Sequence, residues 1–509
     1  MILDGVTEDL RCDIAIIGSG MGGATLAYSL RGTGANVLVL EQGDFLPREK
    51  ANWDPRKVHL EGIYRNSAPW SDKNGEPFVP ANYHYVGGNT KFFGATALRL
   101  RESDFGDIEH SGGVSLRWPL TYADLEPHYA EAERIFWVHG ESGSDPTDPW
   151  RSSEYPYPPV RHEPVIEELA RRLRAQGLHP SHLPLMLDLR RGGKCIRCNT
   201  CDGFPCMVDA KGDADICAMR PALEAGNIEL MVNAQVLRLD TDRRGKRVTT
   251  ATVRHHGRNL SVTASTFVVA AGAINTAALL LRSRSDVHAR GLGNGSDQVG
   301  RNYMNHTTSF LIAVDPRRRN DTVFQKTIGL NDWYEAGTDN QYPLGNVQLL
   351  GKLRGPMVKA AAKKIPLDVL DFVTRRSVDL FVQTEALPTP GNRISVNASD
   401  QIVLEYEVTN LSSHQELIRR LRGCMRGAGY PLVRTELLAD KPSGHQCGTA
   451  RMGVDPSTSV VDPSGRSHEI PNLWLCDTSV FPSSGAVNPA LTVAALALRL
   501  GASGHLIKA

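Results

Sequence analysis

Three glycines and one glutamate near the start of the chain have the spacing of a nucleotide-binding site. Gly18, Gly20 and Gly23 fit the pattern G-x-G-x-x-G, and Glu41 follows eighteen residues after the last glycine. Glycines at this spacing let the backbone turn tightly and approach a pyrophosphate, which a helix N-terminus then binds through unpaired N–H groups. The carboxylate can accept hydrogen bonds from a ribose. The pattern predicts a dinucleotide site but does not separate NAD from FAD.

Four cysteines in the middle of the chain form a second pattern with possible chemistry. They are Cys195, Cys198, Cys201 and Cys206. Thiolates at such spacing hold iron–sulfur clusters or zinc. A compact turn whose thiols bind nothing, or pair reversibly, has the same appearance. No second C-x-x-C completes a zinc ribbon, and Cys217 is out of register, so the alternatives stay open.

The elements around the glycines are those that a dinucleotide site needs. Residues 12–17 and 36–40 are apolar, β-branched runs typical of buried parallel strands, and 24–30 has a helical period. A second strand-to-helix junction follows at 266–281, where small residues favour close approach of a cofactor. Near the C-terminus, 472–476 is predicted to be a strand. The helix that comes next begins at Asn488 and Pro489, and its N-terminus would stabilise negative charge on a reduced ring system.

The remaining periodicity predicts further helices and strands. Helices are expected at 124–138, 164–176 and 414–426, and strands at 228–232, 235–239, 248–256 and 260–264. Residues 310–433 change character, and strands at 310–314, 346–350, 380–384, 393–396 and 402–408 predict a separate antiparallel sheet. Residues 43–80 lack a clear period and are expected to run over the surface. The fold class is therefore α/β, and α+β overall: a Rossmann-like domain with a second domain built on an antiparallel sheet and helices.

Composition restricts the class of protein further. The chain has 509 residues, 41% hydrophobic and 22% charged, with a net charge of +1, which gives no argument for a nucleic-acid or membrane partner. The longest apolar stretches are too short to span a bilayer. Residues 1–11 lack a secretory signal, and nine cysteines argue against a disulfide framework. We expect a soluble, cytoplasmic protein.

Four blocks of sequence in order resemble the glucose–methanol–choline (GMC) family of FAD-dependent oxidoreductases. These blocks are the N-terminal βαβ unit with Glu41, residues 86–96, residues 270–276, and the pair 444–453 and 472–492; residues 299–306 also look like a recurrent family element. The resemblance implies a discontinuous FAD-binding domain of residues 1–100, 207–305 and 440–509. It implies a substrate-binding domain of 101–206 and 306–439, with the cysteine-rich insert at 195–206.

The resemblance also implies catalytic roles for His445 and Asn488. Oxidation of an alcohol requires a base for the hydroxyl proton while a hydride leaves the carbon for flavin N5. A neutral histidine, with an ordinary pKa of about 6.5, suits that task. An asparagine amide can hold the same hydroxyl and stabilise the developing alkoxide. His306, His414 and His468 are expected to be structural.

Cofactor contacts are carried over in the same way, and no metal ligand is assigned. The FAD-binding residues implied are Gly18, Gly20, Met21, Gly23, Glu41, Gly88, Asn89, Thr90, Gly94, Ala95, Val236, Ala271, Gly272, Asp477, Asn488, Pro489 and Thr492. Fungal pyranose oxidases link FAD to a histidine in the block where this chain has Phe92, with Lys91 as the one alternative nucleophile. Non-covalent FAD is therefore expected. The fungal oligomerisation arm has no obvious counterpart, which is consistent with a monomer.

Within the family the chain looks most like the pyranose oxidase branch and its bacterial C-glycoside 3-oxidases. That likeness implies oxidation of a secondary ring hydroxyl of a sugar or glycoside at C3 to a 3-keto product, with O2 or an artificial quinone reoxidising the flavin. Other possibilities stay open: an alcohol or sterol dehydrogenase, a pyranose 2-oxidase, a non-redox lyase, and an electron-transfer flavoprotein with an iron–sulfur cluster on the cysteines. We expect residues 43–80 or the cysteine insert to cover the entrance as a mobile lid.

Overall fold

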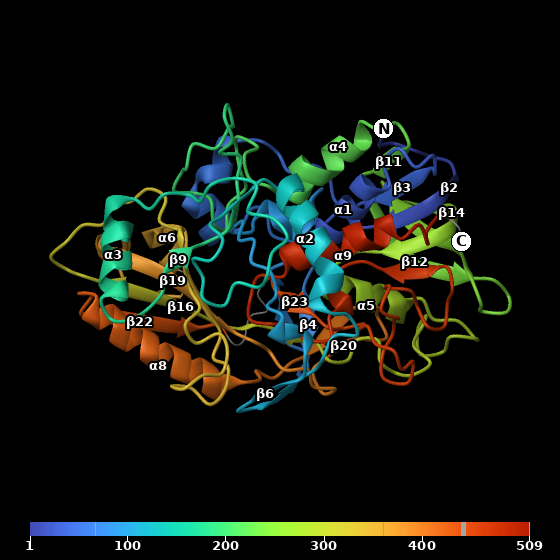
Figure 1. Ribbon diagram of the computed structural model, residues 1–509. Coiled ribbons are helices and arrows are strands. Elements are labelled where there is room, and N and C mark those ends of the chain that lie inside the picture. Colours follow the sequence, from blue (N-terminus) through green and yellow to red (C-terminus); the bar gives the residue numbers. More distant parts are fainter. Residues whose placement is uncertain (67, 360, 439–443, 508–509) are drawn as a thin grey trace.

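Two β-sheets dominate the molecule and lie toward opposite ends (Figure 1). The computed structural model describes residues 1–66, 68–359, 361–438 and 444–507. The larger sheet lies at the end where both termini are found, and an antiparallel six-stranded sheet lies at the other. Helices cover both sheets. The predicted combination of a Rossmann-like α/β unit with an antiparallel sheet is confirmed.

The larger sheet has eight strands in the order β1-β11-β3-β2-β14-β13-β12, with β24 also paired to β14. Its strands are β1 (Ile2–Leu3), β2 (Leu10–Ile17), β3 (Val37–Leu40), β11 (Ile228–Met231), β12 (Ala234–Thr241), β13 (Val248–His255), β14 (Arg258–Val269) and β24 (Leu473–Leu475). Pairing is parallel from β1 to β14 and antiparallel through β13 and β12. All four residues of β3 are buried, because helices cover both faces.

The first helix, α1 (Met21–Ser29), connects β2 to β3 and completes the predicted βαβ unit. It packs against the C-terminal helix α9 (Ala490–Ala502), which in turn packs against α2 (Tyr122–Ile135). A Cβ at Gly22 would lie 1.8 Å from the Cys476 carbonyl oxygen, so α1 sits directly against the chain that follows β24. Residues from the two ends of the sequence thus form one layer.

One strand is longer than the sequence suggested. A strand at 260–264 and a separate strand leading into the junction at 266–281 were expected, but β14 runs without a break from Arg258 to Val269. It pairs with β2 between Val262 and Val269, while its other edge passes from β13, where pairing ends at Thr263, to β24, where pairing begins at Phe267.

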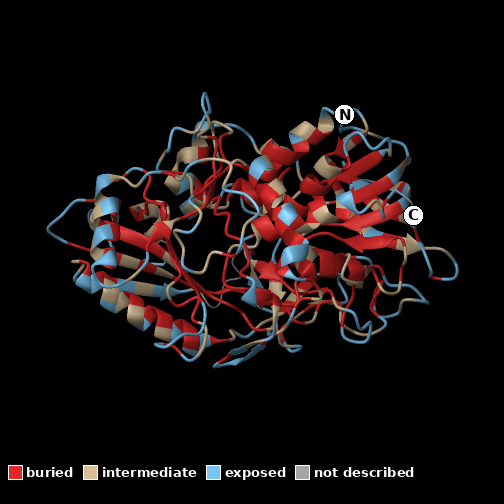
Figure 2. Cartoon of the chain, viewed as in Figure 1, coloured by how far each residue is buried: buried red, intermediate tan, exposed pale blue. Residues whose placement is uncertain are grey.

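The six-stranded sheet has the order β22-β16-β19-β18-β17-β9 and is antiparallel throughout. Its strands are β22 (Leu432–Leu437), β16 (Thr307–Val314), β19 (Ser377–Thr384), β18 (Asn346–Leu349), β17 (Ile328–Leu330) and β9 (Ser181–His182). The helices α3 (Pro164–Arg174) and α8 (Leu411–Gly427) bury their apolar faces on it through residues such as Leu169 and Leu421. Figure 2 shows buried strands under helices whose outer turns are exposed.

Two strands expected in that sheet belong elsewhere. β20 (Arg393–Val396) and β21 (Ile402–Glu405) form a separate four-stranded sheet with β4 (Trp70–Asp72) and β5 (Pro77–Phe78), and β21 runs parallel to β4. Residues 43–80 therefore do not simply run over the surface. They supply two strands and the buried side chains of Val58, Tyr64 and Trp70. Strand periodicity cannot show which sheet a strand joins.

The remaining elements are short. They are β6 (Ile108–His110) with β7 (Gly113–Ser115), β8 (Val138–His139) with β10 (Leu185–Met186), β15 (Met304–Asn305) with β23 (Gln446–Cys447), α4 (Arg220–Leu223), α5 (Ala273–Arg282), α6 (Gly355–Lys359), α7 (Leu367–Thr374), the 3₁₀ turns Lys50–Trp53, Gly88–Lys91, Ser103–Phe105 and Thr478–Val480, and the π-helical turns Arg56–Glu61 and Asp215–Met219. The domain boundary expected at 439/440 lies outside the described residues.

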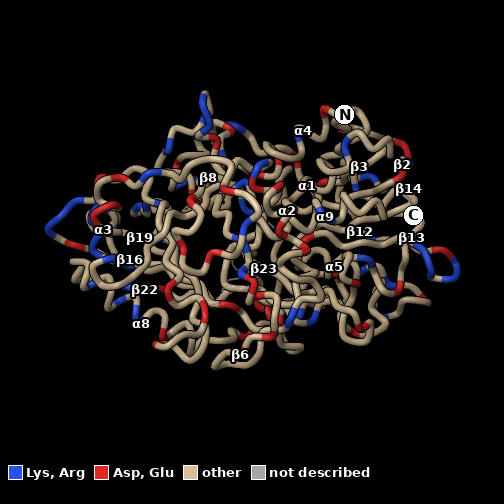
Figure 3. Tube along the Cα trace, viewed as in Figure 1, with Lys and Arg blue, Asp and Glu red and all other residues tan. Residues whose placement is uncertain are grey.

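Charge is distributed without a dominant sign. Basic and acidic residues are both scattered over the trace in Figure 3, in agreement with the net charge of +1. Within the described residues, no helix combines the length and apolar character needed to cross a bilayer.

Candidate active site

A cavity of about 880 Å³ lies between the two sheets, and most of the predicted site residues line it. Its wall includes the loop after β2, the turn at 88–94, the junction of β14 with α5, and the N-terminus of α9. The six-stranded sheet contributes Phe310 and Phe381. The cavity therefore connects a nucleotide-binding end on the larger sheet with a second end on the antiparallel sheet.

Glycine main chain forms much of the nucleotide-binding end. A Cβ at Gly20 or at Gly272 would meet no atom within 4 Å, so both glycines open on the cavity. Gly88 belongs to the next loop, and its added Cβ would lie 3.2 Å from Gly20 Cα. Two glycine loops thus meet at the N-terminus of α1, which leaves room and N–H groups for a pyrophosphate.

Glu41 lies at the end of β3, and its carboxylate turns to the glycine loop. Its Oε2 accepts hydrogen bonds from Ser19 N at 3.0 Å and Ser19 Oγ at 2.6 Å, and Oε1 accepts one from Gly43 N at 3.0 Å. Burial raises the pKa of Glu41. A carboxylate offers about four acceptor positions, so it can still accept hydrogen bonds from a ribose. These residues fit a dinucleotide such as FAD.

A second carboxylate supports the junction between β14 and α5. Asp477 Oδ2 accepts hydrogen bonds from Gly272 N at 2.9 Å and Thr276 Oγ1 at 2.5 Å, and Oδ1 accepts one from Ser479 N at 2.7 Å. Asp477 therefore joins the chain after β24 to the start of α5, where Gly272 adopts φ +83°. This arrangement confirms the second strand-to-helix junction along the cavity.

The structure brings most of the predicted cofactor residues together at the cavity wall. Those that line it are Gly18, Gly20, Met21, Glu41, Gly88, Asn89, Thr90, Gly94, Val236, Ala271, Gly272, Asp477, Asn488 and Pro489. Gly23, Ala95 and Thr492 are buried behind it. A Cβ at Gly23 would lie 2.0 Å from Gly18 O, and Thr492 Oγ1 lies 2.8 Å from Tyr129 OH. These residues pack the site and are not part of its surface.

His445 and Asn488 face each other where the two ends of the cavity meet. His445 Nε2 lies 3.2 Å from Asn488 Nδ2, although the residues come from different elements. Asn488 immediately precedes Pro489, the N-cap of α9, and His445 precedes β23. Both side chains are half-buried and line the cavity. The structure thus places the two residues of the predicted histidine–asparagine pair side by side, and their catalytic role stays a prediction.

Hydrogen bonds set the orientation of the Asn488 amide. Gln348 Oε1 accepts a hydrogen bond from Thr96 Oγ1 at 2.8 Å, so Gln348 Nε2 is the atom that donates to Asn488 Oδ1 at 2.8 Å. The Asn488 amide then presents its N–H to His445 Nε2. Because an amide N–H only donates, Nε2 of His445 is the acceptor, and its lone pair points to the Asn488 amide at the cavity wall.

The same network continues away from the cavity. Gln348 Nε2 also donates to Asn346 Oδ1 at 3.2 Å, and Asn346 Nδ2 donates to Asn331 Oδ1 at 2.6 Å. Asn331 Nδ2 donates to the carboxylate of Asp145 at 2.5 Å. Asp145 can only accept, so the chain of amides has one direction from this carboxylate to Gln348. All three amides are buried.

His306 lies on the other side of His445, a contact that the sequence did not reveal. The two Nδ1 atoms are 3.0 Å apart, and His306 Nε2 lies 3.3 Å from Ser484 O. The carbonyl makes His306 Nε2 the protonated nitrogen, so His306 Nδ1 accepts and His445 Nδ1 donates. His306 was expected to be structural. His414, between Ser309 and Thr384, and His468, beside Ser459, are placed as structural residues would be.

Burial makes His445 hard to protonate. The pKa of His445 lies well below its usual value because of burial, and His306 and Lys326 lower it further while Asp202 opposes them. Burial likewise lowers the pKa of His306. Both imidazoles are therefore neutral at neutral pH, which keeps the Nε2 lone pair of His445 available as a base.

The side chains expected to decide covalent attachment are occupied by other contacts. Lys91 is buried and forms ion pairs with Asp213 at 3.1 Å and Asp215 at 2.9 Å. Phe92 stacks on Tyr83 with ring centroids 3.7 Å apart. Neither side chain presents a nucleophile to the cavity.

The cysteine-rich segment forms part of the cavity wall through Asp202 and Gly203. In the described chain no three of its thiols lie within 4.8 Å of one another, whereas tetrahedral zinc requires sulfurs about 3.8 Å apart. Burial raises the pKa of Cys195 to about 11 and of Cys201 to about 12, which keeps both protonated. This geometry does not match a zinc site. The iron–sulfur alternative stays a prediction, which iron and sulfide analysis of the purified protein would check.

Asp4, His255 and His256 are the described group with metal-ligand spacing, and they are remote from the cavity lining. His255 Nε2 accepts a hydrogen bond from Gly5 N at 3.0 Å, and His256 pairs with Asp4 at 2.5 Å. The ligand atoms are thus used within the protein.

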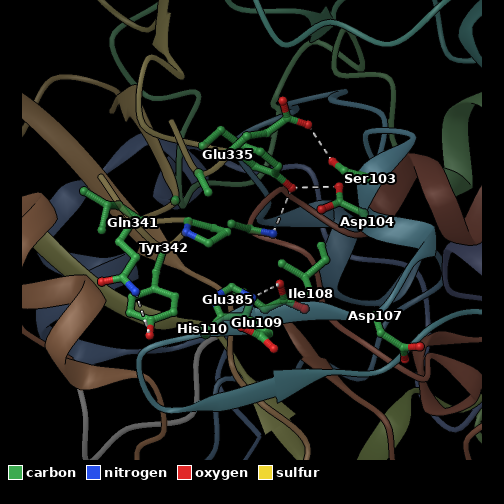
Figure 4. Close-up of a pocket in the computed structure, with 16 residues that line it drawn as sticks. Ser103, Asp104, Asp107, Ile108, Glu109, His110, Glu335, Gln341, Tyr342 and Glu385 are labelled. Carbon is green, nitrogen blue, oxygen red and sulfur yellow. Dashed lines mark hydrogen bonds and ion pairs between the residues drawn. The ribbon is translucent and has the colours of Figure 1, made fainter. Parts of the chain in front are cut away.

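Figure 4 shows a second cavity, of about 370 Å³, whose lining includes Asp104 and Glu385. Ala486, two residues before Asn488, also lines it. Glu385 Oε1 accepts hydrogen bonds from Gly485 N at 3.1 Å and Ser115 Oγ at 2.6 Å. Tyr334 OH accepts one from Ala486 N at 3.1 Å and donates to Asp104 at 2.8 Å. Burial and the charge of Glu385 raise the pKa of Asp104 to about 7. The hydrogen bonds in the wall of this cavity hold Gly485 and Ala486, which precede Asn488 in the same loop.

Comparison with known proteins supports the resemblance. Two family profiles described as GMC oxidoreductase match residues 63–308 and 432–497, and one described as an NAD(P)-binding Rossmann-like domain matches residues 16–47. The 6'''-hydroxyparomomycin C oxidase of Streptomyces lividus is 31% identical over 97% of this chain and 91% of its own. The paromamine 6'-oxidase of Streptomyces fradiae is 30% identical over the same shares. The fructose dehydrogenase large subunit of Gluconobacter japonicus is 27% identical over 97% of both.

Solved structures show the same fold at low identity. Pyridoxine 4-oxidase from Mesorbium loti superimposes with a TM-score of 0.67 at 20% identity and covers 97% of this chain and 99% of that one. Formate oxidase of Aspergillus oryzae RIB40 gives a TM-score of 0.67 at 14% identity and covers 99% of both chains.

Proposed function

The chain belongs to the GMC oxidoreductase family, and from this premise we propose that it oxidises a secondary ring hydroxyl of a sugar or glycoside, at C3, to the ketone. The family makes it an FAD-dependent enzyme acting on CH–OH groups. The relatives named as oxidases of paromamine and hydroxyparomomycin, and as a fructose dehydrogenase, support a sugar-type substrate. The choice of a secondary hydroxyl rests on the likeness of the His445 and Asn488 blocks to the pyranose oxidase branch.

The observation that carries the proposal is the lone pair of His445 Nε2, held 3.2 Å from Asn488 Nδ2 at the cavity wall. A substrate hydroxyl that displaces the Asn488 N–H from this lone pair gives its proton to His445 and receives a hydrogen bond from Asn488 as charge develops on its oxygen. His306 Nδ1 accepts the Nδ1 proton of His445 and so fixes which nitrogen is basic. FAD, when bound, accepts the hydride from the same carbon.

The residues that would hold FAD are the two glycine loops, Glu41 and the N-terminus of α9. We propose that they bind it without a covalent bond, because Lys91 is held by Asp213 and Asp215 and position 92 is Phe92. O2 or a quinone as acceptor, a monomeric state and a cytoplasmic location are parts of the same proposal.

Anaerobic reduction of the bound flavin tests the function. Wild-type holoenzyme mixed with a methyl glucoside should lose its flavin absorbance, whereas His445→Ala should keep FAD and lose reduction by about 10²- to 10⁴-fold. His179→Ala is the control, since His179 is exposed and pairs with Asp332 outside the cavity lining. Reduction of His445→Ala at the wild-type rate would overturn the assignment.

The site of oxidation is tested by the product and by deoxy sugars. A secondary-alcohol oxidase acting at C3 should give a keto-glycoside. A 3-deoxy glucoside should not reduce its flavin. A 6-deoxy glucoside should still react. An aldehyde product, or loss of reaction with the 6-deoxy sugar, would assign the enzyme to the primary hydroxyl instead.

A further inference from the structure

A buried ion pair lies in the wall of the large cavity, and no step of the proposed reaction uses it. Asp202, directly after Cys201, accepts a hydrogen bond from Lys326 Nζ at 2.8 Å through Oδ2. The same oxygen accepts one from Gly351 N at 3.2 Å. The Lys326 side chain is 4% exposed and that of Asp202 17% exposed, and both line the cavity with His445.

Both members of the pair keep unused hydrogen-bonding capacity. Asp202 Oδ1 accepts no hydrogen bond from any residue that the structure describes. Within the same described part of the chain, Lys326 Nζ donates to Asp202 alone, so two of its three protons remain. A Cβ at Gly94 would lie 2.2 Å from Lys326 Nζ and 2.4 Å from Asp202 Oδ1. A side chain at position 94 would overlap both atoms, so glycine lets the ion pair lie against the main chain of the cavity wall, where Asp202 and Lys326 both line the cavity. Buried polar groups with open valences in a cavity wall indicate a polar ligand.

We propose that Asp202 and Lys326 form a subsite that binds ring hydroxyls adjacent to the reacting carbon of a polyhydroxy substrate. The carboxylate oxygen accepts a hydrogen bond from one hydroxyl, and the ammonium donates to the oxygen of a neighbouring hydroxyl. This inference rests on the proposed function, because it requires a sugar-type substrate. It assigns no proton or hydride transfer to either residue.

The charge of the pair selects the class of ligand. Asp202 and Lys326 together are neutral, so a charged substrate gains no net attraction from them, whereas a hydroxyl can both donate and accept. Burial would raise the pKa of Asp202, but Lys326 and the Gly351 N–H outweigh it and hold the pKa below its usual value. The carboxylate is therefore ionised and ready to accept. Neighbouring hydroxyls of a sugar match this pair of opposite groups.

The subsite also explains what the cysteine-rich segment does. Lys211 is buried, and its Nζ donates to the carbonyls of Phe93, Cys201 and Phe204, each at 2.8 Å. This contact joins the segment that bears Asp202 to the wall that contains Gly94. The Cys201 and Phe204 carbonyls lie on either side of Asp202 in the sequence, so the main chain that carries Asp202 is held from both directions.

The pair also acts on the base. Charged and titratable groups face His445 from three elements: His306 after β15, Lys326 before β17, and Asp202 in the cysteine-rich segment. Lys326 and His306 lower the pKa of His445 and Asp202 raises it. Removing Lys326 should therefore move the acidic limb of the reduction rate to higher pH, and removing Asp202 should move it to lower pH. A merely structural role would not give shifts of opposite sign.

The test combines protein variants with deoxy sugars. Anaerobic flavin reduction by methyl glucoside, and by its 2-deoxy and 4-deoxy forms, gives an apparent Kd and a limiting rate for wild-type holoenzyme, Asp202→Asn and Lys326→Met. Each variant should weaken the Kd for the full sugar by about 10- to 100-fold, more than it lowers the limiting rate. The deoxy sugar that lacks the bound hydroxyl should bind wild type as weakly as the full sugar binds the variant. Its affinity should not fall further in the variant. Calorimetric titration of 3-deoxy methyl glucoside, which is not oxidised, should show the same loss without turnover.

The controls separate the possible failures. Lys73→Met removes the same charge from an exposed pair with Glu407 and should change nothing. If a single variant fails to fold, the charge-balanced Asp202→Asn/Lys326→Met protein provides the same comparison. Two results would overturn the subsite alone, provided that sugars still reduce the wild-type flavin. One is that the losses of affinity caused by the variant and by the deoxy sugar are additive. The other is that the pH profiles of the variants do not shift. A wild-type flavin that no sugar reduces would overturn the proposed function and the subsite with it.

Discussion

The two ends of the large cavity are built in different ways. The nucleotide-binding end uses backbone: glycine loops at 18–23 and 87–88, with Glu41 following on the next strand. The other end uses side chains from well-separated places, including Thr96, His306, Gln348, His445 and Asn488. The nucleotide-binding end depends on glycines that have no side chain. The other end depends on side chains whose hydrogen bonds each have a set donor and acceptor.

This contrast indicates how each end should respond to substitution. An added methyl group in a backbone contact has nowhere to go, because the neighbouring atoms are main chain and cannot rotate away. A side-chain network has several members, so removing one weakens the orientation of the next. The loss of reduction rate should therefore become smaller with distance from His445.

Gly22→Ala should abolish the holoenzyme. Its Cβ would lie 1.8 Å from Cys476 O, so α1 could not pack on the chain after β24. We expect little folded, flavin-containing protein, measured as the ratio of flavin to protein absorbance after purification. Gly423→Ala is the matched control, because Gly423 lies in α8 with no atom within 4 Å of its added Cβ. That variant should be neutral or more stable by about 0.5–1 kcal/mol.

His306→Phe should keep FAD and lower the rate of flavin reduction by about 10- to 100-fold, because His445 Nδ1 loses its acceptor. His306 also lowers the pKa of His445, so the acidic limb of the rate should move to higher pH in the variant. Stopped-flow reduction across pH measures both effects. His414→Phe removes an equally buried histidine outside the cavity lining and should leave the rate unchanged. An unaltered pH profile in His306→Phe would reduce His306 to a packing residue.

Gln348→Leu and Asn346→Leu should give a graded series. Gln348 donates directly to Asn488, and Asn346 acts one step farther away, so we expect losses of about 10-fold and about 3-fold in the reduction rate. The limiting rate should fall more than the apparent Kd. A larger loss at Asn346 than at Gln348 would contradict a network that works by orientation.

Asp104→Asn should have the smallest effect, visible mainly in stability. The folded-state pKa of about 7 lies above the usual 3.8. The protonated carboxyl therefore makes its whole contribution to the free energy of unfolding below about pH 4, and this contribution is lost as pH rises through 7. Asparagine resembles the protonated form and can accept the same hydrogen bonds. The Tm of the variant relative to wild type should therefore rise between pH 5 and pH 8. A difference that is constant with pH would contradict the shifted pKa.

The same contrast explains what the sequence could reveal. The βαβ unit, Glu41 and the start of α9 at Asn488 were predictable, because glycine spacing and apolar runs are local signals. His306 was not, although residues 299–306 stood out as a recurrent element. It reaches His445 because Asn305 pairs with Gln446 between β15 and β23, a contact 141 positions apart in the chain. The amide chain from Asp145 has no period, and Asp202 and Lys326 come from loops. β20 and β21 were recognised as strands but placed in the wrong sheet for the same reason.

The amine of Lys211 offers a way to watch the cavity wall open. Three carbonyl oxygens surround it at 2.8 Å and the residue is 1% exposed, so an acylating reagent in solvent cannot reach it while the wall is closed. Labelling of Lys211 then requires residues 201–211 to detach, and its rate measures how often they do. A substrate that bridges Asp202 and Lys326 should slow this labelling. Mass spectrometry of one lysine would thus report ligand binding without any turnover.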